Sequence, residues 1–232
     1  KNNEIIYIVD FSFQDPDHWN SLFNISQSSN VIWIDHHSSS INDKNNPHYL
    51  KGLRENSSLP EYKGKAGCLL TWEYLFKEKE APLIVKMVAD YDTWCHTYPT
   101  GKDFISGLYF KQLFPDREEW PLLLSQPEYE SEFINNSIEI GKTLREESYK
   151  QNKRLCKHQL YSINFHDYNC IVLNNRGNSL MFETVDNLKY QSDILMWWWY
   201  SEDHFEVRIC TENEKIDVSK ISTLDDFNNV IN

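Results

Sequence analysis

Three polar side chains that can bind a metal or move protons follow one apolar run of the sequence. Asp35, His36 and His37 come directly after residues 31–34, whose β-branched and aromatic side chains are typical of a buried strand. Carboxylate and imidazole groups together are ligands for divalent transition metals such as Mn, Fe, Co or Zn. The alternative interpretation is a turn in which Asp35 caps the next element and both histidines face water.

A fourth polar residue is predicted to lie beside this triplet. Asp10 ends another short apolar run, residues 4–9, and a helical pattern beginning at Pro16 separates the two runs. Two strands joined by one helix form a β-α-β unit with parallel strands, whose carboxyl ends meet at one edge of the sheet. We therefore expect Asp10 next to Asp35, although Asp10 can also serve as a cap for the helix that follows it.

Further carboxylates come from the helical pattern of residues 81–94. Asp90 and Asp92 lie near the end of that pattern. Acidic side chains at a helix C-terminus oppose the helix dipole, which points to a functional reason for at least one of them. The alternative is ordinary polarity at the end of a helix.

The order of elements predicts an α/β fold with two domains. Residues 1–127 are expected to form an N-terminal parallel-sheet domain, and residues 128–158 a linking helix. From residue 159 to 232 the pattern changes to strand, strand, helix, strand and strand, which indicates a smaller α+β domain.

Charge and composition restrict the classes of function. The chain has 232 residues and a formal net charge of −12, which argues against binding of long duplex nucleic acid. No apolar run reaches the roughly 20 residues of a membrane span. The five cysteines are odd in number and form no CxxC pair, so free thiols and a cytoplasmic location are expected.

Taken together, these motifs resemble the DHH phosphoesterase superfamily, which includes RecJ-like nucleases, nanoRNases and exopolyphosphatases. The similarity lies in four stretches of the first domain: VDFSF, IDHHSS, KAGCLLTWEYLF and ADYDTW. In the second domain, FEVRICTENEKIDVSKI is similar to the DHH-associated domain, DHHA1. The resemblance implies a DHH domain followed by a DHHA1-like substrate-binding domain.

The resemblance also implies a set of metal ligands. Asp10 would bridge two Mn²⁺ ions, with Mg²⁺ or Co²⁺ as substitutes. His36 and Asp92 would bind the second ion, and Asp90 is the alternate for Asp92. Asp92 is preferred because Thr93 follows it, as in the Asp-Thr motif of the family.

The remaining roles concern catalysis and substrate. Asp35 would orient an imidazole, and His37 would lie near the scissile phosphate. Arg208 of the second domain would bind a substrate phosphate, its alternative being an exposed strand arginine.

The predicted function is metal-dependent hydrolysis of short oligonucleotides or small nucleotide phosphoesters by a metal-activated water. The alternatives are an exopolyphosphatase acting on polyphosphate, and a non-catalytic nucleotide-binding protein. The aromatic run 196–200 can pack internally, stack on bases or form a homodimer interface.

Two family motifs are missing from the printed sequence. The His-x-Asp-x-Asp motif expected before Asp10 and the GGGH loop expected near Ile221 are not found in it. We expect the natural polypeptide to carry both, and the printed sequence alone to hold half of a two-metal site and to lack activity.

Overall fold

The computed structural model shows a mixed α/β fold, as predicted, with a two-stranded parallel sheet and a four-stranded mixed sheet. The chain divides into two compact units, Lys1–Lys142 and Thr143–Asn232. The domain bounds expected from the sequence, 1–127, 128–158 and 159–232, stay a prediction. The structure describes residues 5–11, 16–37, 65–165, 167–174, 183–185, 192–211, 213 and 215–221.

The first unit begins with the predicted β-α-β unit. Strand β1 (Ile5–Val9) pairs in parallel with β2 (Asn30–Ile34), and α1 (Pro16–Ser26) lies between them in the chain. The last residues of the two strands, Val9 and Ile34, are register partners. Asp10 and Asp35 therefore leave the sheet at the same carboxyl edge.

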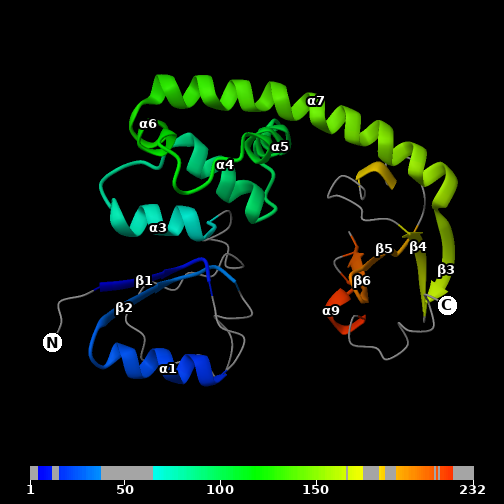
Figure 1. The fold of residues 1–232 in the computed structure, drawn as a ribbon, viewed down its shortest axis with the longest axis horizontal. Coiled ribbons are helices and arrows are strands. Elements are labelled where there is room, and N and C mark those ends of the chain that lie inside the picture. The colour runs from blue at the N-terminus through cyan, green and yellow to red at the C-terminus, as the bar shows by residue number, and fades with distance from the viewer. Residues whose placement is uncertain are drawn as a thin grey trace. The chain divides into compact units, whose positions relative to one another are not determined.

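Helices cover both faces of this strand pair (Figure 1). On one face, the buried side chains Trp19 and Leu22 of α1 pack with Val31 and Trp33 of β2. The indoles of Trp19 and Trp33 meet edge to face, with their centroids 4.9 Å apart. Helix α3 (Gly67–Leu75) lies on the opposite face.

A helical layer completes the first unit. It contains α4 (Leu83–Asp92), α5 (Gly101–Lys111), α6 (Glu119–Ser125) and the N-terminal part of α7 (Pro127–Gln159). The sequence patterns predicted α4 and α7 but not α5 or α6. The shared core of this layer consists of Ile84, Met87, Phe104, Ile105, Leu123 and Ile134.

Glycine allows α5 and α7 to approach closely. A Cβ atom added to Gly141 of α7 would lie 1.7 Å from the carbonyl oxygen of Asp103 in α5. One added to Gly107 of α5 would lie 1.9 Å from the carbonyl oxygen of Ser137. Both distances are far below van der Waals contact, so only glycine fits at these crossing points.

The second unit contains the predicted four strands. They are β3 (Tyr161–Phe165), β4 (Tyr168–Asn174), β5 (Ile194–Ser201) and β6 (His204–Cys210), hydrogen-bonded in that order. The central pair, β4 and β5, is parallel, and the outer pairs are antiparallel. A short helix, α9 (Val218–Ile221), follows the strands.

Most of the aromatic run lies in the core of the second unit. Trp197 and Trp199 are buried in one hydrophobic cluster, whereas Met196 and the partly buried Trp198 belong to another. This alternation follows from the two-residue period of strand β5. Internal packing therefore accounts for the tryptophans, and the homodimer stays a prediction.

No helix that the structure describes combines the length and the apolar character that a membrane crossing requires.

A buried carboxylate supports the start of α4, the helix that carries Asp92. The Oε1 atom of Glu130 accepts a hydrogen bond of 2.7 Å from the backbone N–H of Ile84. That N–H lies in the first turn of α4 and has no partner within the helix. We expect Glu130→Ala to lower the free energy of unfolding by about 1–3 kcal/mol, measured by urea denaturation at pH 7.

Glu128 provides the matched control, because it lies in the same first turn of α7 but is exposed. Glu128→Ala should leave the unfolding free energy nearly unchanged. Equal effects of the two substitutions would show that the hydrogen bond to Ile84 contributes nothing specific.

Candidate metal centre

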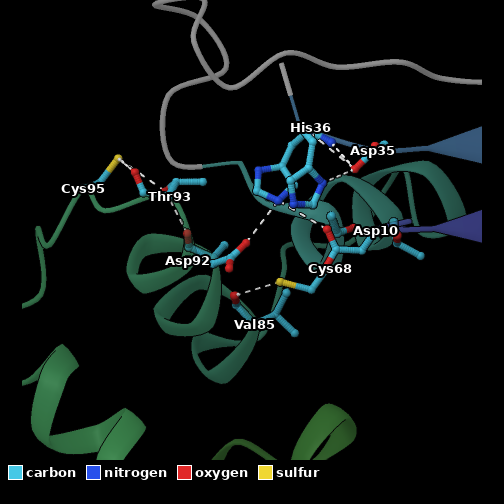
Figure 2. A network of polar contacts seen from close by, with 12 residues as sticks. Asp10, Asp35, His36, Cys68, Val85, Asp92, Thr93 and Cys95 are labelled. Atoms are coloured by element: carbon cyan, nitrogen blue, oxygen red, sulfur yellow. Dashed lines mark hydrogen bonds and ion pairs between the residues drawn. The ribbon is translucent and has the colours of Figure 1, made fainter. Parts of the chain in front are cut away.

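One imidazole lies between two carboxylates at the carboxyl edge of the strand pair (Figure 2). His36 Nε2 is 3.2 Å from Asp10 Oδ1 and 3.1 Å from Asp92 Oδ2. The His36 side chain is 9% exposed, and each carboxylate is 48% exposed. The structure thus brings together Asp10, His36 and Asp92, the three residues predicted from the sequence as metal ligands.

An unusual backbone conformation positions Asp10. Its φ angle is 51°, in the left-handed region, and its N–H donates a 2.9 Å hydrogen bond to the carbonyl of Ile34. Aspartate tolerates this region better than most residues. No local sequence pattern predicts this turn.

Gly67, which the sequence analysis did not single out, makes room for the Asp10 carboxylate. A Cβ atom added to Gly67 would lie 2.6 Å from both Cβ and Oδ1 of Asp10. Because Gly67 is the first residue of α3, the carboxylate lies beside the positive end of that helix dipole. In the sequence, Gly67 stands within the KAGCLLTWEYLF stretch, and no local pattern marks this close approach.

The two carboxylates change the protonation of His36. Hydrogen bonds to Asp10 and Asp92 raise the pKa of His36 to about 9, although burial opposes this shift. The same hydrogen bond from His36 lowers the pKa of Asp10. In the absence of a metal, the centre therefore holds an imidazolium between two carboxylates at neutral pH.

The donor atoms fit a divalent cation. Asp10 and Asp92 each place a carboxylate oxygen within 3.2 Å of His36 Nε2, although Asp92 is not among the described residues whose ligand atoms all lie within 4.8 Å of one another. Asp10, His36 and His37 each also offer a ligand atom within 4.8 Å of the others. Carboxylate with imidazole suits Mn, Fe, Co or Zn, and both Mn²⁺ ions stay a prediction.

Asp35 and His37 form a second contact next to this group. The buried Oδ1 atom of Asp35 lies 2.7 Å from His37 Nδ1 and also accepts a 2.9 Å hydrogen bond from the N–H of His36. When the Nδ1–H of His37 donates a hydrogen bond to Asp35, the Nε2 atom of His37 can bind a metal or a substrate. The rings of His36 and His37 are 4.5 Å apart between centroids.

The other oxygen of Asp35 is also informative. Asp35 Oδ2 is buried and has no hydrogen-bond partner among the residues that the structure describes. A buried orphan oxygen in a native fold commonly marks a place where an ion or water binds. This feature is consistent with a cation near the strand ends.

Asp90, the alternate ligand, lies outside the group. Its carboxylate accepts hydrogen bonds from the N–H of Thr97 at 3.0 Å, from the Thr97 hydroxyl and from the N–H of Tyr98 at 3.3 Å. Burial disfavours ionisation of Asp90, but these hydrogen bonds outweigh it and lower the pKa. Asp90 therefore stabilises the loop after α4, while Asp92 meets His36.

Cys68, one of the predicted free thiols, is a neighbour of this group. Its Sγ atom donates a weak hydrogen bond of 3.8 Å to the carbonyl of Val85 (Figure 2). Burial raises the pKa of the thiol to about 11. In the metal-free protein Cys68 is therefore a neutral thiol at neutral pH.

Arg208 belongs to the second unit. It is exposed on β6, where its register partner is Trp197, and its guanidinium carbon lies 5.3 Å from the centroid of the Trp199 ring. A guanidinium over an indole is a cation–π contact that leaves its N–H groups free to bind other groups. Its predicted contact with a substrate phosphate stays a prediction.

Comparison of the chain with protein-family models, with curated proteins and with solved structures gave no match. The resemblance to the DHH superfamily therefore stays a prediction.

The protonated centre predicts a pH-dependent stability of the metal-free protein. Because the pKa of His36 is raised, its protonation stabilises the fold. This contribution is fully present when the pH is below the ordinary histidine pKa of 6.5, and it is lost as the pH rises through about 9. Because the pKa of Asp10 is lowered, its ionised form stabilises the fold. This contribution is present when the pH is above the ordinary aspartate pKa of 3.8, and it is lost as the pH falls below that value. Near pH 6, the free energy of unfolding of the wild type should exceed that of His36→Gln by about 1–2 kcal/mol, after allowance for solvent screening.

Urea denaturation in the presence of EDTA, repeated between pH 5 and pH 10, measures this difference. The advantage of the wild type should decline toward pH 10. His204→Gln is the control, because the ion pair of His204 with Asp203 is exposed and should matter little. A difference that stays constant across the pH range would contradict the protonated arrangement of His36.

Asp90 and Asp92 should respond differently to substitution. Asp90→Ala removes an acceptor for the N–H groups of Thr97 and Tyr98, so it should destabilise the fold by about 1–3 kcal/mol. Asp92→Ala should destabilise the fold less but weaken Mn²⁺ binding at least about tenfold. Urea denaturation and isothermal titration calorimetry measure the two effects, and the opposite pattern would identify Asp90 as the ligand.

Proposed function

We propose that the protein is a Mn²⁺-dependent phosphoesterase that hydrolyses short oligonucleotides or small nucleotide phosphoesters. The observation that carries this proposal is the contact of His36 with Asp10 and Asp92 at the carboxyl edge of two parallel strands. Ligand sites in α/β folds concentrate at this edge. The resemblance of the same residues to DHH motifs supports the same reaction.

The side chains of the centre divide into two roles. Asp10, His36 and Asp92 would hold the cation, which when bound would supply a positive charge for phosphate oxygens and lower the pKa of a water. Asp35 fixes the ring of His37 through Nδ1, so that Nε2 can exchange a proton with the reacting groups. A carboxylate that orients an imidazole is a common arrangement around catalytic metals.

The charge of the chain supports a small substrate. A formal net charge of −12 disfavours a long polyanion, whose binding depends on many phosphate contacts to basic residues. A short substrate needs only the cation and one or two basic side chains, and we propose Arg208 for the second role. Its planar guanidinium can bind two phosphate oxygens together.

Hydrolysis by the full-length protein tests this proposal directly. We expect Mn²⁺-dependent release of mononucleotides from dinucleotides and trinucleotides. Asp10→Asn should weaken Mn²⁺ binding at least about tenfold and reduce the rate by a larger factor, because it removes a charged ligand. Calorimetry measures the binding, and chromatography of the products measures the rate.

Asp116→Asn is the charge-matched control, because Asp116 is exposed and distant in sequence from the predicted ligands. It should leave both Mn²⁺ binding and hydrolysis unchanged. Phosphate release from polyphosphate without nucleotide cleavage would select the exopolyphosphatase. Nucleotide binding without turnover by any divalent ion, and without a difference in Asp10→Asn, would contradict the enzyme and leave a nucleotide-binding protein.

A further inference from the structure

A pocket of about 370 Å³ in the first unit adjoins the metal centre. This volume lies near the lower end of the about 300–1,000 Å³ that is usual for small-molecule sites. Helices α4 and α5 and the turn after α5 form its walls. The lining includes Tyr91, Asp92, Tyr109, Gln112, Leu113 and Phe114.

Asp92 connects this pocket to the metal centre. It lines the pocket and also lies 3.1 Å from His36 Nε2 through Oδ2. A ligand that occupied both the metal centre and the pocket would thus contact Asp92. Asp92 is thus the residue that the pocket and the candidate metal centre share.

The chemistry of the walls favours an uncharged ring. Apart from Asp92, the lining consists of aliphatic and aromatic side chains with one amide, that of Gln112. None of the described lining residues is a lysine or an arginine, so the pocket itself offers no cationic side chain to a polyphosphate chain. Planar rings, in contrast, stack on aromatic side chains.

The turn after α5 helps to form this apolar wall. Gln112 adopts a left-handed conformation with φ of 50°, and its N–H donates a 3.1 Å hydrogen bond to the carbonyl of Tyr109. The N–H of Phe114 donates a 2.8 Å hydrogen bond to the carbonyl of Gln112. This tight turn ends the helix and brings Leu113 and Phe114 into the lining. Tyr109 and Phe114 are 73% and 54% exposed, so both present aromatic surface that the fold does not cover.

We propose that this pocket binds the base of a nucleotide, while the phosphate lies at the metal centre. This inference rests on the proposed function and narrows its substrate class to nucleoside phosphates, as opposed to polyphosphate. Tyr109 provides the stacking surface, and the Gln112 amide can donate and accept hydrogen bonds at the edge of the base.

Calorimetry with three probes and two variants tests the pocket. The probes are AMP, ribose 5-phosphate and adenosine, each with and without Mn²⁺. We expect the wild-type protein with Mn²⁺ to bind AMP at least about tenfold more tightly than ribose 5-phosphate, as base stacking contributes in other proteins. Tyr109→Ala should reduce this ratio to about one.

Phe110→Ala is the matched control. Phe110 is the next residue of α5, is 61% exposed and does not line the pocket. It should retain the preference for AMP. Both side chains are largely exposed, so neither substitution is expected to unfold the protein, which circular dichroism can verify.

The probes separate failure of this proposal from failure of the proposed function. Equal affinity for AMP and ribose 5-phosphate, or equal losses in Tyr109→Ala and Phe110→Ala, would overturn the base pocket. Mn²⁺-dependent binding of ribose 5-phosphate would then still support the phosphoesterase. Conversely, Tyr109-dependent binding of adenosine without any effect of Mn²⁺ on the phosphate probes would support the pocket and contradict the phosphoesterase.

Discussion

The contact of one imidazole with two carboxylates is the interaction on which the rest of the site depends. Asp10 and Asp92 both carry negative charge and both approach His36 Nε2, so their arrangement requires a positive charge between them. A proton on His36 supplies it in the metal-free protein, and a divalent cation can replace that proton. Three elements, β1, β2 and α4, must therefore be held in place against the mutual repulsion of the two carboxylates.

The acidic residues of the first unit divide according to their burial. The buried carboxylates Asp35, Asp90 and Glu130 accept hydrogen bonds from backbone N–H groups and so stabilise the strand end, the loop after α4 and the start of α4. The side chains of Asp10 and Asp92 are half exposed, and each forms an ion pair with His36. Burial thus separates carboxylates that hold the backbone from those that can accept a ligand.

The sequence predicted the part of the site that depends on local patterns. The two strands and the helix between them follow from apolar runs and helical spacing, and parallel pairing then brings Asp10 and Asp35 to one edge. Asp90 and Asp92 were harder to distinguish, because both end the same helical pattern. Side chains two positions apart on a helix point about 200° apart, so only one of them can face His36.

Other features depend on contacts that no local pattern contains. The left-handed turn at Asp10 and the missing Cβ of Gly67 are complementary only after β1 and α3 pack together. Likewise, α5 is a short helix with apolar residues around much of its surface. That α5 forms a wall of the pocket follows only from its packing beside α4. The resemblance to DHH motifs supplied the preference for Asp92, which spacing alone did not.

The position of Asp92 in both the metal centre and the pocket has a physical consequence for binding. Asp92 is the only charged residue among the described residues that line the pocket, and an apolar ring binds poorly beside an uncompensated carboxylate. A cation held by Asp92, as proposed, would compensate that charge and would also attract a phosphate. The same ion would therefore favour both parts of a nucleotide, so the metal centre and the pocket are expected to bind it cooperatively.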